Sequence, residues 1–391
     1  MTRHKTPLIF VLAGEQSGDM IGGKLLAAIK DITKDNVKFI GVGGQNMAEQ
    51  GLDSIFPMSD LSVMGLFEVI KHLPVIYSRF KEVKQAITDY KPDIVITIDA
   101  PDFSLRLSKH IKSLNIPHIH YIAPTVWAWR PGRAKSIAKK IDHLLAVYPF
   151  EPKYFEVHNL PCTFVGHMIS ELNIDGIART QFREKHDIAK STKLICWLPG
   201  SRMSEVELLV PIHKQALIDL QQHYPDMVVA LPVAPSVADY VKSQIIDLPF
   251  KVITVEDTQE RYAAMRAANV ALAASGTVNL ELSMAQTPFV ITYKINPLTA
   301  WLAKLILKDQ YVTMVNILCD GPVIPELLQE DCTPDNISSV INHLFINKSS
   351  VENQLEGQRT ANIMLRHISH KPSYAAAKIV LSYLEKAKNI K

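Results

Sequence analysis

Two aspartates stand three residues apart directly after an apolar run that predicts a buried strand. The run is Asp93–Ile98, and the following residues read DAPDF. In open parallel sheets, ligands bind beyond the carboxyl ends of the strands. A carboxylate placed there can take a proton from an attacking hydroxyl group, so one of the pair is a candidate general base. In the alternative interpretation Asp102 caps the helix predicted over Phe103–Leu114, and Asp99 forms the turn.

A glycine-containing turn follows the predicted strand Val270–Ala274. The turn consists of Ser275, Gly276 and Thr277, and Glu281 lies one turn into the next helical pattern. Glycine lets the backbone approach a ligand closely, and the start of a helix favours an anion such as phosphate. Glu281 could accept hydrogen bonds from sugar hydroxyls beside that phosphate. An ordinary strand-to-helix turn with a solvated glutamate is the structural alternative.

A second turn of this kind follows Leu194–Leu198. Gly200, Ser201 and Arg202 stand there, directly before another predicted helix. The guanidinium of an arginine can bind a diphosphate through two parallel hydrogen bonds. Further along the chain, Asn316 could donate its side-chain amide to a leaving phosphate.

The first turn of the chain combines an anion site with a carboxylate. The apolar run Pro7–Ala13 predicts a buried parallel strand, and Glu15, Ser17 and Gly18 follow it before a helix. Ser17, Gly18 and the helix N-terminus could bind an anion. Glu15 suits a sugar hydroxyl better than an anion.

Indoles and basic side chains follow the predicted strand His118–Ile122. An indole can stack on a sugar and a guanidinium can hold a phosphate, which makes Trp127 and Arg130 candidate ligands for a sugar phosphate. Core aromatics beside a solvated basic helix are the alternative. Within the strand, His118 and His120 point to one face. Because no third ligand stands nearby, we interpret them as structural histidines and predict no metal site.

The segment 61–76, LSVMGLFEVIKHLPVI, carries apolar residues on two helical faces. A surface helix needs only one apolar stripe. The segment is therefore either buried on both sides or in contact with a membrane surface. Arg79, Lys81 and Lys84 follow it, which suits anionic head groups.

Length, composition and charge limit the classes of protein to which the chain can belong. The chain has 391 residues, 47% hydrophobic and 21% charged, which is typical of a globular protein of two domains. A net charge of +3 gives no electrostatic reason to expect nucleic acid as a partner. Four scattered cysteines without a C-x-x-C pair indicate a reducing compartment. No apolar run approaches the roughly 18 residues of a spanning helix, and the N-terminus lacks a cleavage site. We expect a cytoplasmic protein.

Strand and helix patterns alternate in both halves of the chain. This predicts an α/β fold of two facing Rossmann-like domains with parallel sheets. The polar stretch 168–192 suits a connection between them. We expect a first domain over 1–170, a second over 171–365, and a C-terminal helix within 366–391 that packs back on the first domain. Pro325 and Glu326 are expected to start a helix.

Seven short stretches, in this order, resemble the lipid-A-disaccharide synthase family of glycosyltransferases. They are AGEQSGD at 13–19, VMG at 63–65, DAPDF at 99–103, VWAWR at 126–130, LPGSR at 198–202 with Glu205, SGT at 275–277 with Glu281, and NIL at 316–318. Each stretch alone is weak evidence for the family, whereas all seven in this order are specific evidence. The resemblance covers nearly the whole chain.

The resemblance implies a GT-B-type architecture and a particular reaction. The donor would be UDP-2,3-diacylglucosamine and the acceptor 2,3-diacylglucosamine 1-phosphate. Inverting transfer would give a β(1→6)-linked disaccharide 1-phosphate for lipid A and release UDP. Similar enzymes need no metal or other cofactor, so we expect none. Because both substrates carry acyl chains, we expect peripheral contact with the cytoplasmic face of the inner membrane. The chain could also assemble as a homodimer.

The resemblance also distributes roles among the residues. Asp102 would take the proton of the acceptor 6-hydroxyl, and Glu15 would orient that group or share the role. The preference for Asp102 over Asp99 rests on the resemblance alone. The expected donor contacts are Gly200, Ser201, Arg202, Ser275, Gly276, Thr277, Glu281 and Asn316. The expected acceptor contacts are Ser17, Gly18, Trp127 and Arg130. The expected membrane contacts are Met64, Leu66, Phe67, Val69, Ile70 and Leu73.

Two other functions fit the same patterns. A UDP-sugar 2-epimerase would use the same fold and the same kind of UDP site, without acyl specificity or an apolar entry segment. A catalytically silent lipid or nucleotide binder would keep the sites and lack turnover. Release of UDP only when both acylated sugars are present distinguishes the transferase from both.

Overall fold

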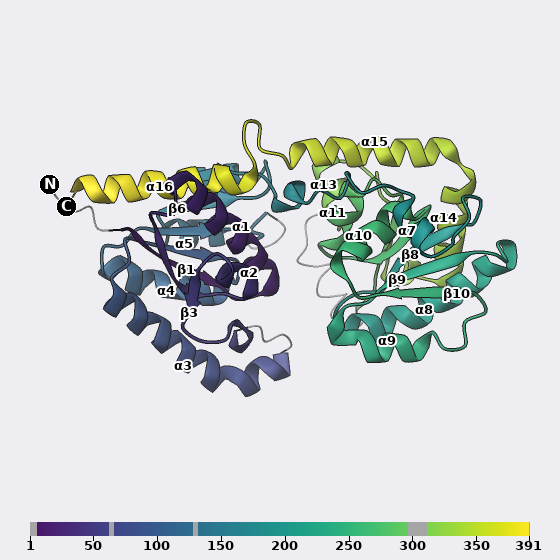
Figure 1. The fold of residues 1–391 in the computed structure, drawn as a ribbon, viewed down its shortest axis with the longest axis horizontal. Coiled ribbons are helices and arrows are strands. Elements are labelled where there is room, and N and C mark those ends of the chain that lie inside the picture. The colour runs from purple at the N-terminus through teal and green to yellow at the C-terminus, as the bar shows by residue number, and fades with distance from the viewer. Residues whose placement is uncertain (1–5, 62–65, 128–131, 296–310, 391) are drawn as a thin grey trace. The chain divides into compact units, whose positions relative to one another are not determined.

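The computed structural model describes residues 6–61, 66–127, 132–295 and 311–390, with only the backbone for 66–71 and 387–390. The chain divides into two compact units, one of Met1–Glu171 with Leu365–Lys391 and the other of Leu172–Met364 (Figure 1). The boundaries expected from the sequence, after residues 170 and 365, lie one residue away from these.

A parallel sheet with the strand order β3-β2-β1-β4-β5-β6-β7 forms the centre of the first unit. Its pairs are all parallel, as continuous apolar runs predict. The strands are β1 (Leu8–Ala13), β2 (Lys38–Val42), β3 (Leu52–Ser54), β4 (Ile94–Ile98), β5 (His118–Tyr121), β6 (His143–Ala146) and β7 (Cys162–Phe164).

Helices cover both faces of this sheet (Figure 1). Ile9 of β1 packs with Leu25 of α1 and Val380 of α16, whereas the next residue, Phe10, packs with Leu107 of α4 on the opposite face. Successive strand residues point to opposite faces, so one strand joins both cores. Each fully buried side chain of this size contributes about 1.5–3 kcal/mol. The helices are α1 (Gln16–Thr33), α2 (Gln45–Ala48), α3 (Leu66–Tyr90), α4 (Pro101–Ser113), α5 (Arg133–Ala138), α6 (Pro152–Glu156) and α16 (Pro372–Ile390).

The second unit contains a parallel sheet with the strand order β10-β9-β8-β11-β12-β13. Its strands are β8 (Leu194–Leu198), β9 (Val228–Pro232), β10 (Lys251–Val255), β11 (Val270–Ala274), β12 (Phe289–Tyr293) and β13 (Glu326–Leu328). The helices are α7 (Gln181–Lys185), α8 (Met203–His223), α9 (Ala238–Gln244), α10 (Thr258–Ala267), α11 (Val278–Met284), α13 (Met314–Cys319), α14 (Pro334–Ile346) and α15 (Lys348–Met364).

A buried chain of hydrogen bonds fixes the centre of the second sheet. Trp197 Nε1 donates to His213 Nδ1 at 2.9 Å, and His213 Nε2 lies 2.8 Å from Thr292 Oγ1. Because Nδ1 accepts, Nε2 carries the proton and donates to Thr292. Thr292 Oγ1 in turn donates to the carbonyl of Ala273. The chain ties α8 to strands β8, β11 and β12, and the carboxyl ends of β8 and β11 carry the predicted glycine turns.

The expected helix at Pro325 and Glu326 is wrong. Glu326 begins the edge strand β13, which pairs with β12. Proline has no N–H to donate and is tolerated where a strand begins; the Pro325 carbonyl accepts from Ile291 N at 2.9 Å. The short strands β3, β7 and β13 are each three residues long. Such runs are too short to show periodicity.

His118 and His120 share one hydroxyl group in the core of the first unit. Thr97 Oγ1 lies 2.9 Å from His118 Nε2 and 2.8 Å from His120 Nδ1. Both rings are fully buried, and their other nitrogens have no partner among the described residues. Both histidines are thus buried core residues that bond one hydroxyl group, and each ring is only half satisfied within the described residues.

These two histidines should make the first unit sensitive to acid. Burial lowers the pKa of His118 to about 3 and that of His120 to about 4. The unfolded chain takes up protons below a pKa of about 6.5. The stability associated with the neutral rings is thus present above pH 6.5 and is lost as the pH falls. We expect a loss of about 2 kcal/mol per ring at pH 5 relative to pH 7.5.

Urea unfolding of the full chain at both pH values measures this loss. His120→Asn should show a smaller loss between pH 7.5 and pH 5 than the unsubstituted chain. His223→Asn, a change at an exposed position, should show the full loss. An equal loss in all three chains would contradict the assignment.

Candidate active site

The carboxyl ends of β4, β5, β6 and β7 bring four loops together along one edge of the first sheet. The order of these parallel strands places residues 99–102, 122–127, 147–151 and 165–167 side by side. Three non-glycine residues there have positive φ: Asp99 at 53°, Ala100 at 45° and Ile122 at 76°. Such conformations cost about 1–3 kcal/mol each and cluster at functional sites. This edge is the candidate site of the first unit.

Asp99 and Asp102 occupy different environments at this edge. Asp99 is half-buried, and its Oδ1 accepts the N–H of Ala100 at 2.9 Å. Burial raises the pKa of Asp99, which a general base requires in order to hold a proton. The side chain of Asp102 is 84% exposed and pairs with Arg133 at 3.2 Å. The environment therefore favours Asp99 as the base, in place of the Asp102 preferred from the resemblance.

Glu15 follows β1 and lies close to the loop after β4. A Cβ atom on the preceding residue, Gly14, would stand 3.0 Å from the Cβ of Ala100. The β1 loop and the β4 loop therefore touch, which places Glu15 beside the loop that carries Asp99. Ser17 is exposed at the start of α1. Gly18 is buried, and a Cβ there would meet Ala13 at 3.3 Å, so a glycine permits close packing of α1; the expected contact of Gly18 with the acceptor stays a prediction.

Trp127 belongs to an aromatic cluster at the same edge. Its ring meets Phe150 edge to face at 5.2 Å between centroids, and Phe150 stacks on Tyr148 at 5.7 Å. The Trp127 side chain is half-buried, which leaves part of the ring for a ligand. Arg130, the other predicted acceptor contact after β5, lies outside the described residues.

The two glycine turns of the second unit lie side by side. β8 and β11 are parallel neighbours, with Leu198 paired to Ala273. Gly200 has a φ of 123°, and a Cβ on it would stand 3.6 Å from the Cβ of Ala274. Only glycine adopts that conformation without strain. The segment 200–202 thus faces the segment 275–277, in which Ser275 is half-buried and Gly276 and Thr277 are exposed.

Arg202 stands at the N-terminus of α8, a helix of 21 residues. Its side chain is 57% exposed, and Nη1 bonds Glu205 Oε1 at 2.8 Å. The guanidinium keeps further donors for an anion that the helix N-terminus also favours. Tyr293, at the end of β12, lies near enough that Glu205 contributes to its raised pKa, after burial as the main cause. The sequence contained no signal for Tyr293 as a site residue beyond its place at a strand end.

Glu281 is held by an arginine that the sequence did not single out. Arg261 on α10 donates from Nη2 to Glu281 Oε1 at 2.6 Å. Glu281 Oε2 and Arg261 Nε are buried and have no partner within the described ranges, and burial raises the pKa of Glu281. A free buried carboxylate oxygen suits a hydroxyl donor such as a ribose diol. Arg261 precedes its partner by 20 residues, so no local pattern could reveal the pair.

Asn316 uses its side-chain amide within the second unit. It is buried, and its Nδ2 donates to the carbonyl of Ile324 and to Glu326 Oε1, both at 2.9 Å. Its Oδ1 accepts the N–H of Ile324 at 2.7 Å. Both amide protons are used within the protein, and Asn316 holds the segment between α13 and β13. The expected contact of Asn316 with the donor stays a prediction.

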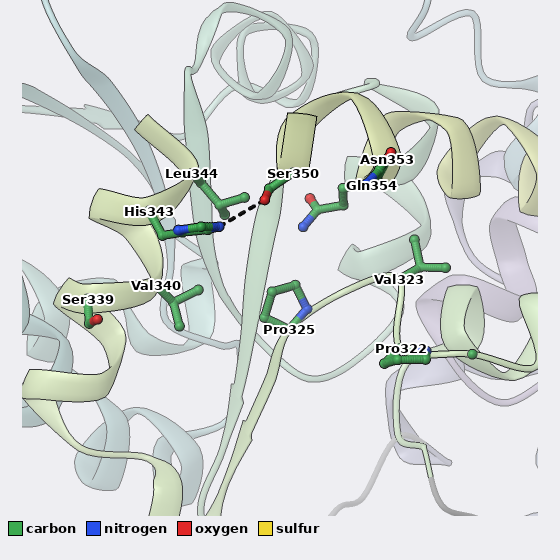
Figure 2. Close-up of a pocket in the computed structure, with 11 residues that line it drawn as sticks. Pro322, Val323, Pro325, Ser339, Val340, His343, Leu344, Ser350, Asn353 and Gln354 are labelled. Atoms are coloured by element: carbon green, nitrogen blue, oxygen red, sulfur yellow. Dashed lines mark hydrogen bonds between the residues drawn. The ribbon is translucent and has the colours of Figure 1, made fainter. Parts of the chain in front are cut away.

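A cavity of about 650 Å³ lies elsewhere in the second unit (Figure 2). Pro325, His343 and Gln354 are among the residues that line it, and His343 bonds Ser350 at 2.8 Å. Pro325 precedes β13, so the cavity lies at the amino ends of the strands. The predicted donor residues follow the carboxyl ends. The cavity is therefore separate from the candidate site.

The predicted membrane segment coincides with the start of α3. Leu73 is 51% exposed, and Val75 and Tyr77 on the same helix are exposed as well. Met64 lies outside the described residues, and the side chains of Leu66, Phe67, Val69 and Ile70 are not described. Among the described helices, none has the length and apolar character needed to cross a membrane.

Comparison with solved structures identifies the fold class of the chain. The chain aligns over 98% of its length, and 98% of the other chain, with UDP-bound MnaA from S. aureus, at a TM-score of 0.67 and 12% identity. It aligns over 97% of its length, and 99% of the other chain, with MurG from Acinetobacter baumannii, at a TM-score of 0.57 and 14% identity. Such identities show the fold alone. Two Rossmann-like units with parallel sheets are the GT-B architecture, as predicted.

Sequence comparisons identify the family within this class. The LpxB family model, described as lipid-A-disaccharide synthetase, matches residues 9–380. A lipid-A-disaccharide synthase from Rhodospirillum centenum is 44% identical over 384 residues, which is 98% of this chain and 96% of the relative. One from Paramagnetospirillum magneticum is 40% identical, over 97% of this chain and 98% of the relative. The chain belongs to the lipid-A-disaccharide synthase family and is a UDP-sugar glycosyltransferase of lipid A biosynthesis.

Proposed function

We propose that this chain transfers 2,3-diacylglucosamine from UDP-2,3-diacylglucosamine to the 6-hydroxyl of 2,3-diacylglucosamine 1-phosphate, with inversion. The family match over residues 9–380 carries the proposal. The acceptor oxygen bonds the anomeric carbon of the donor, the bond from that carbon to the diphosphate breaks, and UDP leaves with the electron pair. The hydroxyl proton passes to a carboxylate of the first unit.

Asp99 is the base in this proposal, and Glu15 orients the acceptor. The support for Asp99 is its half-buried carboxylate, its raised pKa and the strained backbone at 99 and 100. Trp127 provides an apolar face on which the acceptor sugar can stack. Ser17, exposed at the start of α1, can hydrogen-bond to the acceptor.

The donor binds at the carboxyl edge of the second sheet in this proposal. Arg202, with Ser201 and the N-terminus of α8, stabilises the charge that develops on the leaving diphosphate. Ser275 and Thr277 add hydroxyl groups from the neighbouring turn. Glu281, oriented by Arg261 at 2.6 Å, accepts hydrogen bonds from the ribose.

Gly276→Ala should separate donor binding from folding. Apart from its two chain neighbours, no atom of the described residues lies within 4 Å of a Cβ built on Gly276, and its φ is not positive. The alanine is thus accommodated by the protein, while its methyl group occupies space that the proposal gives to the diphosphate. We expect an unchanged melting temperature and a KM for the UDP-sugar that rises about tenfold or more.

Gly200→Ala is the matched control. Gly200 has a positive φ, so an alanine at this position strains the fold itself. Calorimetry and donor-dependent kinetics measure both effects. An unchanged donor KM in Gly276→Ala would place the diphosphate elsewhere.

We also propose that α3 contacts the cytoplasmic face of the inner membrane through its exposed apolar side chains. Withdrawing a leucine from an apolar environment costs about 1.5–3 kcal/mol. Leu73→Ser should therefore weaken binding to lipid vesicles by roughly tenfold without altering stability. Vesicle co-sedimentation measures this. Ile246→Ser, at an exposed position of the second unit, should bind as the unsubstituted chain does, and equal binding by all three chains would exclude α3 from the contact.

Identification of the product tests the proposed reaction. Incubation with both acylated sugars should yield a β(1→6)-linked disaccharide 1-phosphate, recognised by mass spectrometry and by the anomeric coupling in its proton spectrum. An α-linked product would exclude inversion. An epimerised UDP-sugar in place of a disaccharide would favour a 2-epimerase.

A further inference from the structure

Glu151 is a buried carboxylic acid at the carboxyl edge of the first sheet. β5 and β6 are parallel neighbours, so the loop 147–151 after β6 lies beside the loop 122–127 after β5. The Glu151 residue is only 1% exposed. It belongs to neither the candidate base nor the donor site, and its burial needs an explanation because an ionised group is costly in an apolar environment.

The two carboxylate oxygens of Glu151 have unequal surroundings. Oε2 accepts the backbone N–H groups of Val147 and Tyr148, both at 3.0 Å. Oε1 is buried without a partner in the described part of the chain, and the same holds for Trp127 Nε1. The Trp127 indole nevertheless approaches closely enough to lower the pKa of the Glu151 carboxyl group. A free donor and a free acceptor thus face each other inside the protein.

The aromatic cluster packs around this pair. Trp127 meets Phe150 edge to face at 5.2 Å, and Tyr148 stacks on Phe150 at 5.7 Å. Tyr148 also meets the ring of His167 at 5.5 Å. The indole nitrogen itself is buried although the rings are only half-buried, so the acceptor that the Trp127 N–H can reach is Oε1 of Glu151.

We propose that Glu151 is a positioning residue: its Oε1 accepts the indole N–H of Trp127 and thereby fixes the orientation of the ring that contacts the acceptor sugar. This inference rests on the proposed function, in which Trp127 contacts the acceptor. Glu151 itself touches no reacting atom. Its effect on the reaction passes through Trp127 and should appear in the affinity for the acceptor.

Protonation of Glu151 should break this hydrogen bond. Oε2 already accepts two N–H groups, so an added proton goes to Oε1 and makes it a donor opposite another donor. Burial, as the main cause, raises the pKa of this carboxyl group to about 7. The bond is then present above about pH 7 and lost below it.

Among the described residues around Glu151, three titratable side chains are neutral near pH 7 and therefore do not titrate in its place. Burial raises the pKa of Tyr148 and of Cys162 and lowers that of His167 to about 4, so all three are neutral near pH 7. On the adjoining helix α6 the charged side chains are Lys153 and Glu156. Neither is among the causes that shift the pKa of Glu151.

Indole N–H resonances of the full chain, labelled with ¹⁵N-tryptophan, test the proposal without any substrate. The chain has four tryptophans, and Trp127→Phe identifies the relevant resonance. We expect it to move upfield with a midpoint near pH 7 as the pH falls from 8.5 to 5.5. Trp197, bonded to His213, is the internal control and should not move. A Trp127 resonance that does not titrate, or that titrates equally in Glu151→Gln, would overturn the proposal.

Acceptor kinetics supply the second measurement. Glutamine mimics the protonated acid. Its side-chain oxygen must accept the two backbone N–H groups, so its NH₂ group then presents N–H donors to the indole N–H. Glu151→Gln should raise the acceptor KM about tenfold at pH 8 and leave the donor KM unchanged. In a Trp127→Phe background the same change should have no further effect on the acceptor KM. Equal rises in both KM values would refute a positioning role. Loss of the proposed function would instead appear as no turnover in the unsubstituted chain, with the titration intact.

Discussion

Asp99→Asn is expected to lower turnover by about 10²–10⁴, with the affinity for the UDP-sugar unchanged. Asparagine keeps the shape of the side chain. Its oxygen can accept the Ala100 N–H, as Asp99 Oδ1 does at 2.9 Å in the unsubstituted chain. It removes the oxygen that takes the proton of the acceptor hydroxyl. Because the proposed donor contacts all belong to the second unit, the loss should fall on the chemical step.

Asp102→Asn is the matched control, since both aspartates follow the same strand. Its carboxylate is exposed and, among the described residues, pairs with Arg133. Surface ion pairs contribute about 0–1 kcal/mol, so turnover should change by less than about fivefold. Steady-state kinetics with saturating donor and isothermal titration with UDP measure the two quantities. The reverse order of effects would restore Asp102 as the base.

Arg202→Ala is expected to lower turnover by about 10²–10³ and to weaken UDP binding. The proposed leaving group carries a developing negative charge, and Arg202 supplies the exposed guanidinium at the N-terminus of α8. Lysine keeps the charge without the planar pair of donors. Arg202→Lys should therefore recover only part of the loss.

The control for this change is Glu205→Gln. It retains Arg202 and weakens the bond of 2.8 Å that now holds the guanidinium. If Arg202 acts on the diphosphate directly, Glu205→Gln should retain much more activity than Arg202→Ala. Equal losses in the two variants would show that the pair matters only as a structural bond. Stopped-flow measurement of the first turnover distinguishes the chemical step from product release.

The sequence was sufficient for most of the architecture. Runs such as Leu8–Ala13 and Val270–Ala274 are apolar throughout and end at turn residues, so their burial as parallel strands could be predicted directly. Proline often begins a helix, so Pro325 predicts a helix where β13 lies. What decides its state is pairing with β12 at the edge of the sheet, and that pairing is a tertiary contact.

The site was only partly predictable for the same reason. The spacing of Asp99 and Asp102 showed two carboxylates at a strand end, but the difference in burial between them depends on how α4 meets the sheet. Asn316 stands in a motif that suggested a ligand contact, and only the structure shows both of its amide protons in use.

Some site residues gave no sequence signal at all. Arg261 matters because it bonds Glu281 of another helix, and Glu151 matters because it is buried close to Trp127. A pattern of residue types does not encode burial that arises between elements distant in the chain. The residues that sequence reasoning found were those next to strand ends and glycines, where local and functional signals coincide.

Release of UDP, followed in one assay with either or both acylated sugars, is the most direct test of the proposed transfer. We expect UDP release that requires both UDP-2,3-diacylglucosamine and 2,3-diacylglucosamine 1-phosphate, with one disaccharide formed for each UDP. UDP release that proceeds without the acceptor, or no release with both sugars present, would contradict transfer between the two substrates.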